Sequence, residues 1–355
     1  MAILCQGASV NHLGKSSAVV ARGFSVSVVV PVRDEEQAIG VLLECLYQQT
    51  RWPEEVVIVD GGSTDRTPLV VQHYIAKGYP IRLIRTPHAY PGEGRNRGIR
   101  EAEHAVIALT DAGVRPCLEW LERLCEPLER DPAIAVVYGT YEPLTRTYFD
   151  ECAALAYVPA RLGPERGNIR GPSIASTLIR KEVWAGVGGF PGYRASEDLI
   201  FIERVERRGF KTAYAPGAWC AWELARGWRG TFRRFAVYSY HNLVAGRGRY
   251  WHMGLMRQYL IALPFAFLAI AHHYLWWSVP VVGFGARVGR TMWRKRGQFS
   301  FENPLHPLRW LTVAVILVLL DTATWVGAAV WVWRRMASGF SRLRMGSFGN
   351  PSSKA

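Results

Sequence analysis

Acidic residues stand at three places where a buried strand is expected to end. The first cluster is Arg33-Asp34-Glu35-Glu36, the second Asp60-Gly61-Gly62-Ser63 and the third Asp111-Ala112-Gly113. In open α/β sheets, ligands bind beyond the carboxyl ends of the strands. Carboxylates placed there can hold a divalent cation against phosphate oxygens or take a proton from a hydroxyl. Helix capping or turn formation explains any one cluster, but poorly explains all three together.

Two further acids, Glu197 and Asp198, follow Ser196 at the start of an amphipathic helix expected over Leu199 to Arg208. A carboxylate at this position could serve as a general base. A serine followed by acids is also typical of a helix N-terminus, so capping alone remains an alternative for both residues.

The elements that must position these acids alternate between strand and helix. Short apolar, β-branched runs predict strands at residues 26–32, 56–59, 81–84, 105–110 and 133–138. Apolar residues at helical spacing predict helices over 35–49, 68–76, 92–102 and 119–128. Residues 170–180 are typical of a strand or a loop. This order predicts an α/β fold with a mostly parallel sheet and helices on both faces.

Charge is distributed unevenly along the 355 residues, whose formal net charge is +14. After Ala225 there are 18 Lys and Arg residues but only two acids, Glu302 and Asp321, whereas the preceding residues are nearly balanced. The basic part also contains the least polar stretches. We therefore expect an anionic membrane as partner and no nucleic acid. The composition excludes a disordered chain, and the scattered cysteines do not have the spacing of a zinc site.

Two apolar segments could enter that membrane. Residues 310–333 contain one charge, Asp321, and are long enough to span a bilayer, so we predict that they form a transmembrane helix. Asp321 could be functional, or it could face a neighbouring helix or a lipid headgroup. Residues 258–286 are uncharged but contain Pro264 and Pro280. They form either one kinked span or a re-entrant hairpin, and the flanking charges leave both open; we favour the hairpin.

Seven motifs occur in a fixed order between about Val26 and Arg249: VVVPVRDEE, VVIVDGGSTDRT, GRNRGI, LTDAG, a GGF turn, the SED triplet and GWRGTFRRFAVYSYHN. Together they resemble the family 2 glycosyltransferases of the GT-A fold. These enzymes use nucleotide sugars, have a Rossmann-like nucleotide-binding half and often carry C-terminal membrane helices. The resemblance predicts a GT-A domain over residues 25–225, preceded by a leader (1–24). An amphipathic interfacial segment (226–257), membrane-embedded helices (258–335) and a basic tail (336–355) would follow.

The resemblance also implies a nucleotide-sugar site made of Pro31, Arg33, Glu35, Asp60, Arg95, Asn96 and Asp111. Asp60 would receive the base, and Arg95 with Asn96 would contact the diphosphate, although Arg95 could equally be a solvated charge. Asp111 would hold Mg²⁺ or Mn²⁺. The family usually has a second acid two residues later, where this chain has Gly113, which predicts a weakened metal site.

By the same resemblance, Asp198 is the catalytic base, with Glu197 beside it, and a single displacement inverts the anomeric centre. An aromatic and basic group would cap the acceptor and the diphosphate; it consists of Trp228, Arg229, Arg233 and Arg234. The alternative for this group is an amphipathic helix lying on anionic lipid.

The sequence as a whole predicts a membrane-anchored glycosyltransferase with a lipid-linked or membrane-proximal acceptor. We expect it at the plasma membrane with the catalytic domain in the cytoplasm, because the N-terminus lacks the features of a signal peptide. A non-catalytic nucleotide-sugar-binding scaffold is the alternative, suggested by Gly113. A nucleotidyltransferase is disfavoured, because the acidic RDEE stands where a glycine-rich basic loop would be needed.

Overall fold

The structure is a computed structural model that describes residues 23–163, 169–299, 301, 303 and 306–346, so most of the predicted leader and residues 347–355 of the predicted tail lie outside it. Eight strands form one mixed sheet in the order β3-β2-β1-β4-β7-β6-β8-β5. Their bounds are β1 (Val26–Val32), β2 (Glu55–Asp60), β3 (Ile81–Arg85), β4 (Val106–Leu109), β5 (Val114–Pro116), β6 (Val136–Leu144), β7 (Thr177–Arg180) and β8 (Thr212–Glu223). Strands β3, β2, β1 and β4 are parallel, and β7 runs antiparallel to β4 and β6.

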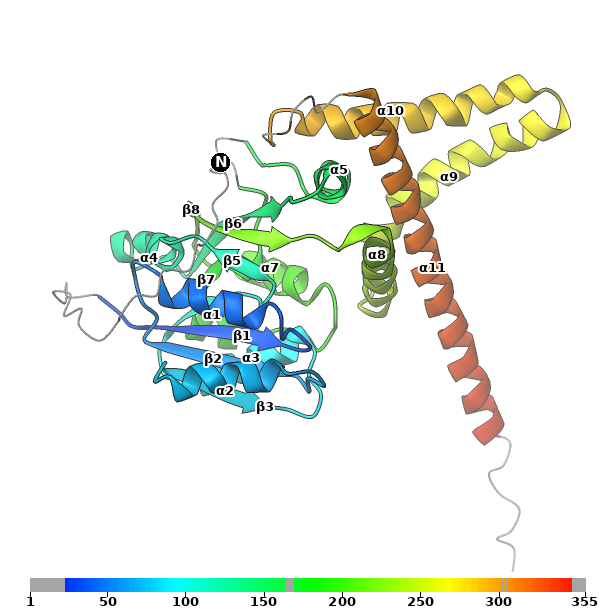
Figure 1. Cartoon of the computed structure of the whole chain (residues 1–355). Helices are drawn as coiled ribbons and strands as arrows, with labels where there is room; N and C mark the ends of the chain where they lie inside the picture. The colour runs from blue at the N-terminus through cyan, green and yellow to red at the C-terminus, as the bar shows by residue number, and fades with distance from the viewer. Residues whose placement is uncertain (1–22, 164–168, 300, 302, 304–305, 347–355) are drawn as a thin grey trace, which may run out of the picture.

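Helices cover both faces of this sheet, as predicted (Figure 1). One face packs against α1 (Ile39–Tyr47), α2 (Thr67–Ala76) and α4 (Trp120–Arg130). The other packs against α3 (Pro91–Glu101), α6 (Lys181–Gly186) and α7 (Glu197–Arg207). In β1, Val28 and Val30 belong to the first core and Val29 to the second, because successive side chains of a strand point to opposite faces. The α/β fold with a mostly parallel sheet is confirmed.

Four helices and strands were not predicted: α5 (Tyr148–Tyr157), α6, β5 and β8. The start of α5 does carry a capping signal, since Thr147 Oγ1 accepts a hydrogen bond from Asp150 N at 3.2 Å and the Asp150 carboxylate accepts one from Thr147 N. Strand β8 contains Pro216 and Gly217, which interrupt a strand pattern, and its pairing with β6 shifts register between Tyr138 and Thr140.

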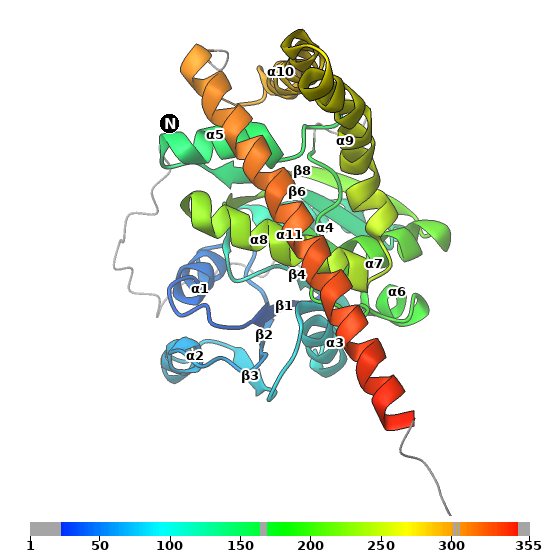
Figure 2. The same cartoon turned by 90° about the vertical axis from the view of Figure 1, so that its right-hand side faces the viewer.

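The C-terminal helices form a separate layer beside the sheet domain. They are α8 (Gly227–Val244), α9 (Gly248–Ala271), a 3₁₀ turn η3 (Tyr274–Trp277), α10 (Ser278–Lys295) and α11 (Pro307–Gly346). Figure 1 shows α9 and α10 projecting from the body as a hairpin with η3 at its tip, and Figure 2 shows α11 crossing in front of α8. Residues 258–286 therefore reverse direction at η3 and are not one kinked helix.

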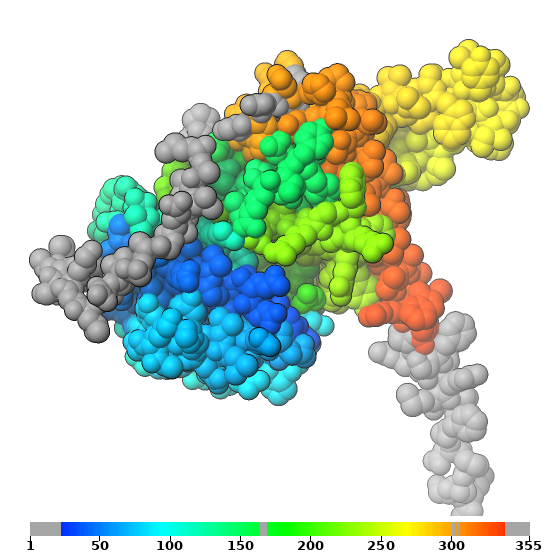
Figure 3. All heavy atoms as spheres, in the orientation of Figure 1, coloured from blue at the N-terminus to red at the C-terminus, as the bar shows by residue number. Residues whose placement is uncertain are grey.

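A third core joins this layer to the domain. Residues of α5, such as Cys152 and Leu155, pack with Met292 of α10 and with Val313 and Leu317 of α11. Two helices of the described chain, Gly248–Ala271 and Pro307–Ala337, are long and apolar enough to cross a membrane, by length and composition. They differ in burial: α9 is almost wholly exposed, as Figure 3 shows for the hairpin, whereas half of the apolar window of α11 is buried against the protein.

Candidate active site

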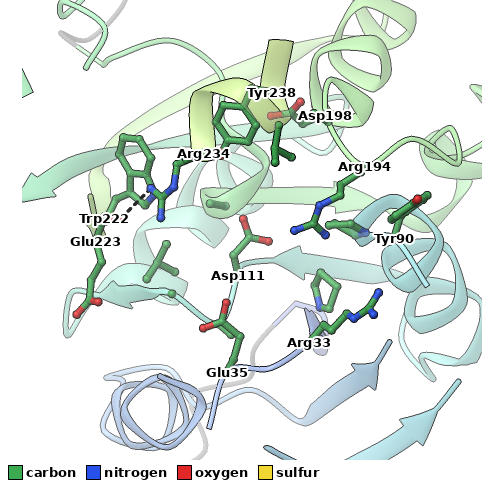
Figure 4. A pocket seen from close by; sticks show the side chains of 18 of the residues that line it. Arg33, Glu35, Tyr90, Asp111, Arg194, Asp198, Trp222, Glu223, Arg234 and Tyr238 are labelled. Carbon is green, nitrogen blue, oxygen red and sulfur yellow. Dashed lines mark hydrogen bonds between the residues drawn. The ribbon is translucent and has the colours of Figure 1, made fainter. Parts of the chain in front are cut away.

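A cavity of about 1320 Å³ opens where the predicted acidic clusters meet, at the carboxyl ends of β1 and β4 (Figure 4). The loop after β1, the start of α3, the end of β4, the start of α7 and one side of α8 enclose it. Most of the predicted site residues line it: Pro31, Arg33, Glu35, Arg95, Asp111, Glu197, Asp198, Arg233 and Arg234. The fold thus brings together side chains that are more than 200 positions apart in the sequence.

Arg95 is the buried centre of the acidic side of this cavity. Its Nη2 lies 2.6 Å from Asp111 Oδ1 and its Nη1 lies 3.0 Å from Glu197 Oε1, and the side chain is 4% exposed. Burial alone would lower the pKa of Arg95, but Asp111 and Glu197 raise it, so the guanidinium stays charged. Because both ends of the guanidinium are engaged by carboxylates, Arg95 ties the end of β4 to the start of α7. The predicted contact with phosphate would have to displace one of these partners.

Glu197 and Asp198 are neighbours in different environments. Glu197 is paired with Arg95, and burial nevertheless raises the pKa of its carboxyl to about 7. Burial also raises the pKa of Asp198, whose Oδ1 accepts a hydrogen bond from Leu199 N at 2.8 Å. Among the ion pairs of the described residues none includes Asp198. Its carboxylate lies near Tyr238 at the rim of the cavity (Figure 4), where it is the freer of the two acids.

The turn that carries these two acids is strained and is held from α8. Ser196 has a φ of 67°, in the left-handed region that residues other than glycine seldom adopt. Its hydroxyl donates to Asn242 Oδ1 at 2.7 Å, and both side chains are buried. Asn242 belongs to α8 and was not predicted from the sequence. A left-handed serine persists only when the surrounding structure holds it, so this contact fixes where α7 begins.

Helix α8 presents one side to the cavity through residues spaced three or four positions apart: Gly230, Arg233, Arg234, Val237 and Tyr238. Trp228 and Arg229 are not among the residues that line the cavity. The Trp228 ring packs against Phe149 of α5 with centroids 4.8 Å apart. The helical period separates these residues, since Trp228 is turned toward α5 while Arg234 is turned toward Glu223, whose carbonyl oxygen lies 3.4 Å from Arg234 Nη1 (Figure 4).

Two further predicted site residues, Asp60 and Asn96, lie outside the cavity lining. Asp60 is completely buried and does not line the cavity; its Oδ1 accepts a hydrogen bond from Ser63 N at 2.8 Å and so shapes the turn whose Gly61 does line it. Asn96 holds a different turn. Its Oδ1 accepts from Trp184 Nε1 and Phe190 N, and its Nδ2 donates to Phe190 O at 2.7 Å. Both residues support the site from outside it.

Several cavity residues were missed in the sequence, notably Tyr90, Arg194, Trp222, Glu223 and Tyr238. Figure 4 shows Arg194 pointing into the cavity from the loop between the GGF turn and Ser196. The position of Arg194, two residues before Ser196, is the sequence feature that could have identified it as a site residue. Tyr238 lies one helical turn after Arg234, so the period of α8 would have found it. Trp222 and Glu223 end the unpredicted strand β8.

Asp111 is the residue that could bind a metal ion. Its Oδ1 is engaged by Arg95, but the side chain is 39% exposed and lines the cavity. Glu35 faces it from the loop after β1 (Figure 4), and the pKa of Glu35 is raised by burial and by the charge of Asp111. The described residues contain no group of three or more His, Cys, Asp or Glu side chains that could hold a metal by themselves. One carboxylate still fits a Mg²⁺-type ion, which commonly takes its other oxygens from phosphate and water.

Comparison with known proteins identifies the sheet domain. Residues 27–185 match the glycosyl transferase family 2 model. Glycosyltransferase AglE of Haloferax volcanii is 25% identical over 198 residues, which cover 54% of this chain and 64% of AglE, so the match omits about a third of that relative. Succinoglycan biosynthesis protein ExoA of Rhizobium meliloti is 24% identical over 325 residues, which cover 84% of this chain and 93% of ExoA.

A solved structure supports the same fold. Mannosyltransferase PcManGT from Pyrobaculum calidifontis superimposes with a TM-score of 0.50 at 18% identity and covers 88% of each chain. The family match ends at residue 185, before Glu197, Asp198 and α8, so the roles of those residues are not part of it. Residues 27–185 therefore match glycosyltransferase family 2, and the sheet domain, which extends to β8, has the GT-A fold.

Proposed function

We propose that this protein is a membrane-anchored, inverting glycosyltransferase that moves a sugar from a nucleotide diphosphate donor to an acceptor at the membrane. The acceptor group would be a hydroxyl or phosphate of a lipid-linked or membrane-proximal molecule. The observation that carries this proposal is the continuity of the cavity. It joins the strand ends of the family 2 domain to Asp198 and to the arginines of α8.

The donor would occupy the end of the cavity nearest the sheet. Pro31, Arg33 and Glu35 lie there on the loop after β1, and Gly61 contributes the turn after β2. The related fold of PcManGT was solved in complex with GDP-Man and Mn²⁺, which supports a nucleotide sugar for this one. Three arginines would meet the charge of the diphosphate: Arg194, Arg233 and Arg234 line the same cavity, and arginine suits phosphate because its donors are fixed in a plane.

A divalent cation, Mg²⁺ or Mn²⁺, would be held by the free oxygen of Asp111 together with the diphosphate. When bound it would neutralise charge on the departing nucleotide. The lack of a second acid at Gly113 leaves space rather than another ligand, since a Cβ built at that residue meets no atom within 4 Å. We expect weak metal affinity in the free protein and stronger affinity in the presence of nucleotide.

Asp198 would act as the general base. An acceptor hydroxyl must lose its proton as its oxygen attacks the anomeric carbon and the bond from that carbon to the diphosphate oxygen breaks. Asp198 can take that proton because its carboxylate lies in the cavity and has no cationic partner among the described ion pairs. Glu197 is engaged by Arg95 and would position the turn. A displacement of this kind, with no covalent intermediate on the protein, inverts the anomeric configuration.

The acceptor would enter from the side of the C-terminal helices. Tyr157 of α5, Phe235 of α8 and Trp251 of α9 line the cavity there, and aromatic rings bind both sugar faces and apolar chains. The apolar helices α9 and α11 favour an integral membrane location. We infer the plasma membrane, with the catalytic domain in the cytoplasm, which fits an acceptor assembled on lipid.

The test is transfer by an Asp198→Asn variant of the full chain in membranes, assayed against a panel of nucleotide sugars. We expect a loss of about 10²- to 10⁴-fold in turnover, the usual contribution of a general base, with donor binding unchanged in a thermal shift assay. Asp131→Asn is the control, because that acid pairs with Lys211 outside the cavity. Retention of most of the turnover would refute the assignment of the base.

A non-catalytic scaffold is the second candidate, favoured by Gly113 alone. Such a protein would bind a nucleotide sugar without consuming it. Slow hydrolysis of a radiolabelled nucleotide sugar in the absence of acceptor would separate the two, since water replaces the acceptor only in an enzyme. No hydrolysis and no transfer with any bound donor would favour the scaffold.

A further inference from the structure

We propose that helices α8, α9, α10 and α11, with the turn η3, bind an anionic phospholipid bilayer from one side and do not cross it. In this arrangement α11 lies along the bilayer surface. The arm, defined as residues 258–286 in α9, η3 and α10, enters the leaflet nearest the catalytic domain. This inference rests on the membrane anchoring proposed above but not on the transfer of sugar.

Both ends of the apolar part of α11 contact the catalytic domain. Arg309 Nη1 lies 2.6 Å from Glu151 Oε2 of α5. Arg334 Nη1 lies 3.3 Å from the Tyr240 hydroxyl of α8, and its guanidinium stands 5.1 Å from the centre of that ring. These arginines are 25 positions apart, a rise of about 37 Å along the helix, which is more than the roughly 30 Å of a bilayer core. A helix that crossed the bilayer would carry one of these contacts to the far side.

The middle of α11 is also held against α8. The Ser239 hydroxyl donates to Thr324 O at 2.7 Å, and a Cβ built on Gly327 would stand 2.3 Å from Ala236 O, so the two backbones touch. Asp321 and Thr322 mark the centre of the apolar stretch and would lie at the bilayer midplane if it spanned. Helix α8, with Arg233 and Arg234, would then be drawn into hydrocarbon, where charged side chains are costly.

The side of α11 that faces away from the domain is nevertheless apolar. Its exposed residues recur at helical spacing: Leu308, Leu311, Val315, Val318, Trp325 and Trp333. Figure 2 shows α11 lying obliquely across the face from which the arm projects. A helix with one buried side and one exposed apolar side, parallel to a surface, is suited to lie in the membrane interface.

Each uncharged leg of the arm is shorter than the hydrocarbon core of a bilayer. Its first leg, residues 258–271, rises about 21 Å and its second, residues 278–286, about 14 Å, against the roughly 30 Å of a bilayer core. Most of its side chains are apolar and many are exposed, as at Leu260, which is 63% exposed. The chain then returns to the domain: Lys295 Nζ donates to Leu155 O at 2.7 Å and Arg161 N donates to Gln298 Oε1 at 2.8 Å.

The distribution of charged residues indicates how deeply the arm inserts and that the membrane surface it meets is anionic. The arm has no charged residue, whereas exposed arginines stand at its base on both legs: Arg249, Arg257, Arg290, Arg294 and Arg296. Anionic headgroups attract such a basic rim while the apolar tip enters the acyl chains. Within the layer, Asp321 is neutralised by Arg287, whose Nη1 and Nη2 lie 2.6 and 2.8 Å from its carboxylate oxygens.

The topology is tested with the full chain, its native cysteines replaced, in proteoliposomes of phosphatidylethanolamine and phosphatidylglycerol. Single cysteines are introduced by Asp131→Cys, Leu275→Cys, Arg294→Cys and Arg335→Cys. Position 131 reports the side of the catalytic domain. We expect a membrane-impermeant maleimide to label positions 131, 294 and 335 from the same side, and position 275 from neither. Labelling of 275, 294 or 335 from the opposite side would overturn the proposal.

Flotation tests the partner and uses a matched pair of variants. Leu260→Glu places a charge in the arm, and Leu69→Glu places one at an equally exposed position on α2; both leucines are 63% exposed. We expect at least a tenfold weaker association with phosphatidylglycerol-containing vesicles for Leu260→Glu and no change for Leu69→Glu. Failure of the unaltered protein to float on vesicles of lipid alone would assign this surface to a membrane protein partner instead. Neither readout depends on transferase activity, so each can fail while the proposed function stands.

Discussion

Two clusters pair an arginine with carboxylates, one beside the cavity and one among the C-terminal helices. They differ in the number of carboxylates that the arginine meets. Arg95 meets two carboxylates, Asp111 and Glu197, and so leaves an excess of negative charge beside a third acid, Asp198. Arg287 meets one, Asp321, whose carboxylate also accepts a hydrogen bond from the Tyr259 hydroxyl at 3.2 Å. In the first cluster, burial raises the pKa values of Glu197 and Asp198, which line a cavity. The second cancels a charge beside apolar helices.

The comparison indicates that a cluster with an excess of one charge serves the functional site, whereas a cluster with equal positive and negative charge serves the packing of the helices. An excess acid beside a cavity can exchange a proton with a ligand. A pair of one cation and one anion neutralises its own charge and holds two elements together, here α10 and α11. Each cluster can be broken separately, and the four experiments below are ordered from the largest expected effect to the smallest.

Breaking the first cluster should have the greatest effect on stability. Arg95→Ala leaves Asp111 and Glu197 as unpaired acids, and removing one partner of a buried pair typically costs about 3–5 kcal/mol of unfolding free energy. Arg97→Ala is the matched control on the same helix, because Arg97 pairs with Glu101 at 3.1 Å in an exposed i,i+4 bridge worth about 0–1 kcal/mol. Denaturant unfolding of the solubilised protein measures both. Equal effects of the two substitutions would contradict a central role for Arg95.

Breaking the second cluster should weaken the arm and spare the chemistry. Asp321→Ala removes the partner of Arg287, and losing hydrogen bonds to a charged group costs about 1–3 kcal/mol. In the detergent-solubilised protein, where lipid does not cover the tip of the arm, we expect faster proteolysis of residues 272–278, with transfer kinetics little changed. Replacing both residues, as Arg287→Leu with Asp321→Leu, should restore much of the protection, because no unpaired charge remains. Loss of transfer in proportion to proteolysis would show that the two clusters are coupled.

Breaking the hydrogen bond between Ser196 and Asn242, which links the sheet domain to α8, should have an effect of intermediate size on turnover. Asn242→Ala removes the acceptor of the Ser196 hydroxyl and lets the turn before Asp198 relax, which should lower kcat about tenfold through misplacement of the base. Ser196→Ala breaks the same bond and should have a similar effect, and the double variant should add little. Additive losses would mean that the two side chains do not act through this contact.

The smallest change is a shift in pH dependence. Burial raises the pKa of Asp198 and raises that of Glu197 to about 7. A base must be deprotonated, so the rate should fall as the pH decreases through an apparent pKa above the ordinary value of about 4 for aspartate. That value belongs to the pair. Glu197→Gln removes the negative neighbour and should move the acid limb to lower pH. An unmoved limb would indicate that the two acids titrate independently.

The sequence predicted the first half of the sheet domain well, for a physical reason. Parallel strands buried on both faces are continuous apolar runs, as in Val26–Val32 and Glu55–Asp60, and turn residues bound them on both sides. The acidic clusters could be located because the ends of such strands share one edge. Strand β8 was missed because pairing with β6 on one side and β5 on the other, and not its own pattern, makes it a strand.

The candidate site was predicted less completely than the fold. Residue types marked Asp111, Asp198, Arg233 and Arg234 as chemical candidates, and these do line one cavity. Motifs could not show that Asn96 faces a turn or that Trp228 faces α5, since these depend on which side of a helix meets which neighbour. They also could not show Ser196 bound to Asn242, 46 positions away, because nothing local requires that contact.

The residues alone determined an α/β domain with acids at its strand ends, a basic C-terminal third and two apolar segments, since periodicity, composition and charge are local properties. The tertiary structure determined which acids are paired with an arginine. Arg95 of α3 forms ion pairs with Glu197 and Asp111 and not with Asp198. The tertiary structure also decided that residues 258–286 turn back and that the apolar residues 310–333 lie against α5 and α8. An apolar stretch specifies burial, but whether protein or lipid buries each side depends on what the rest of the chain places beside it.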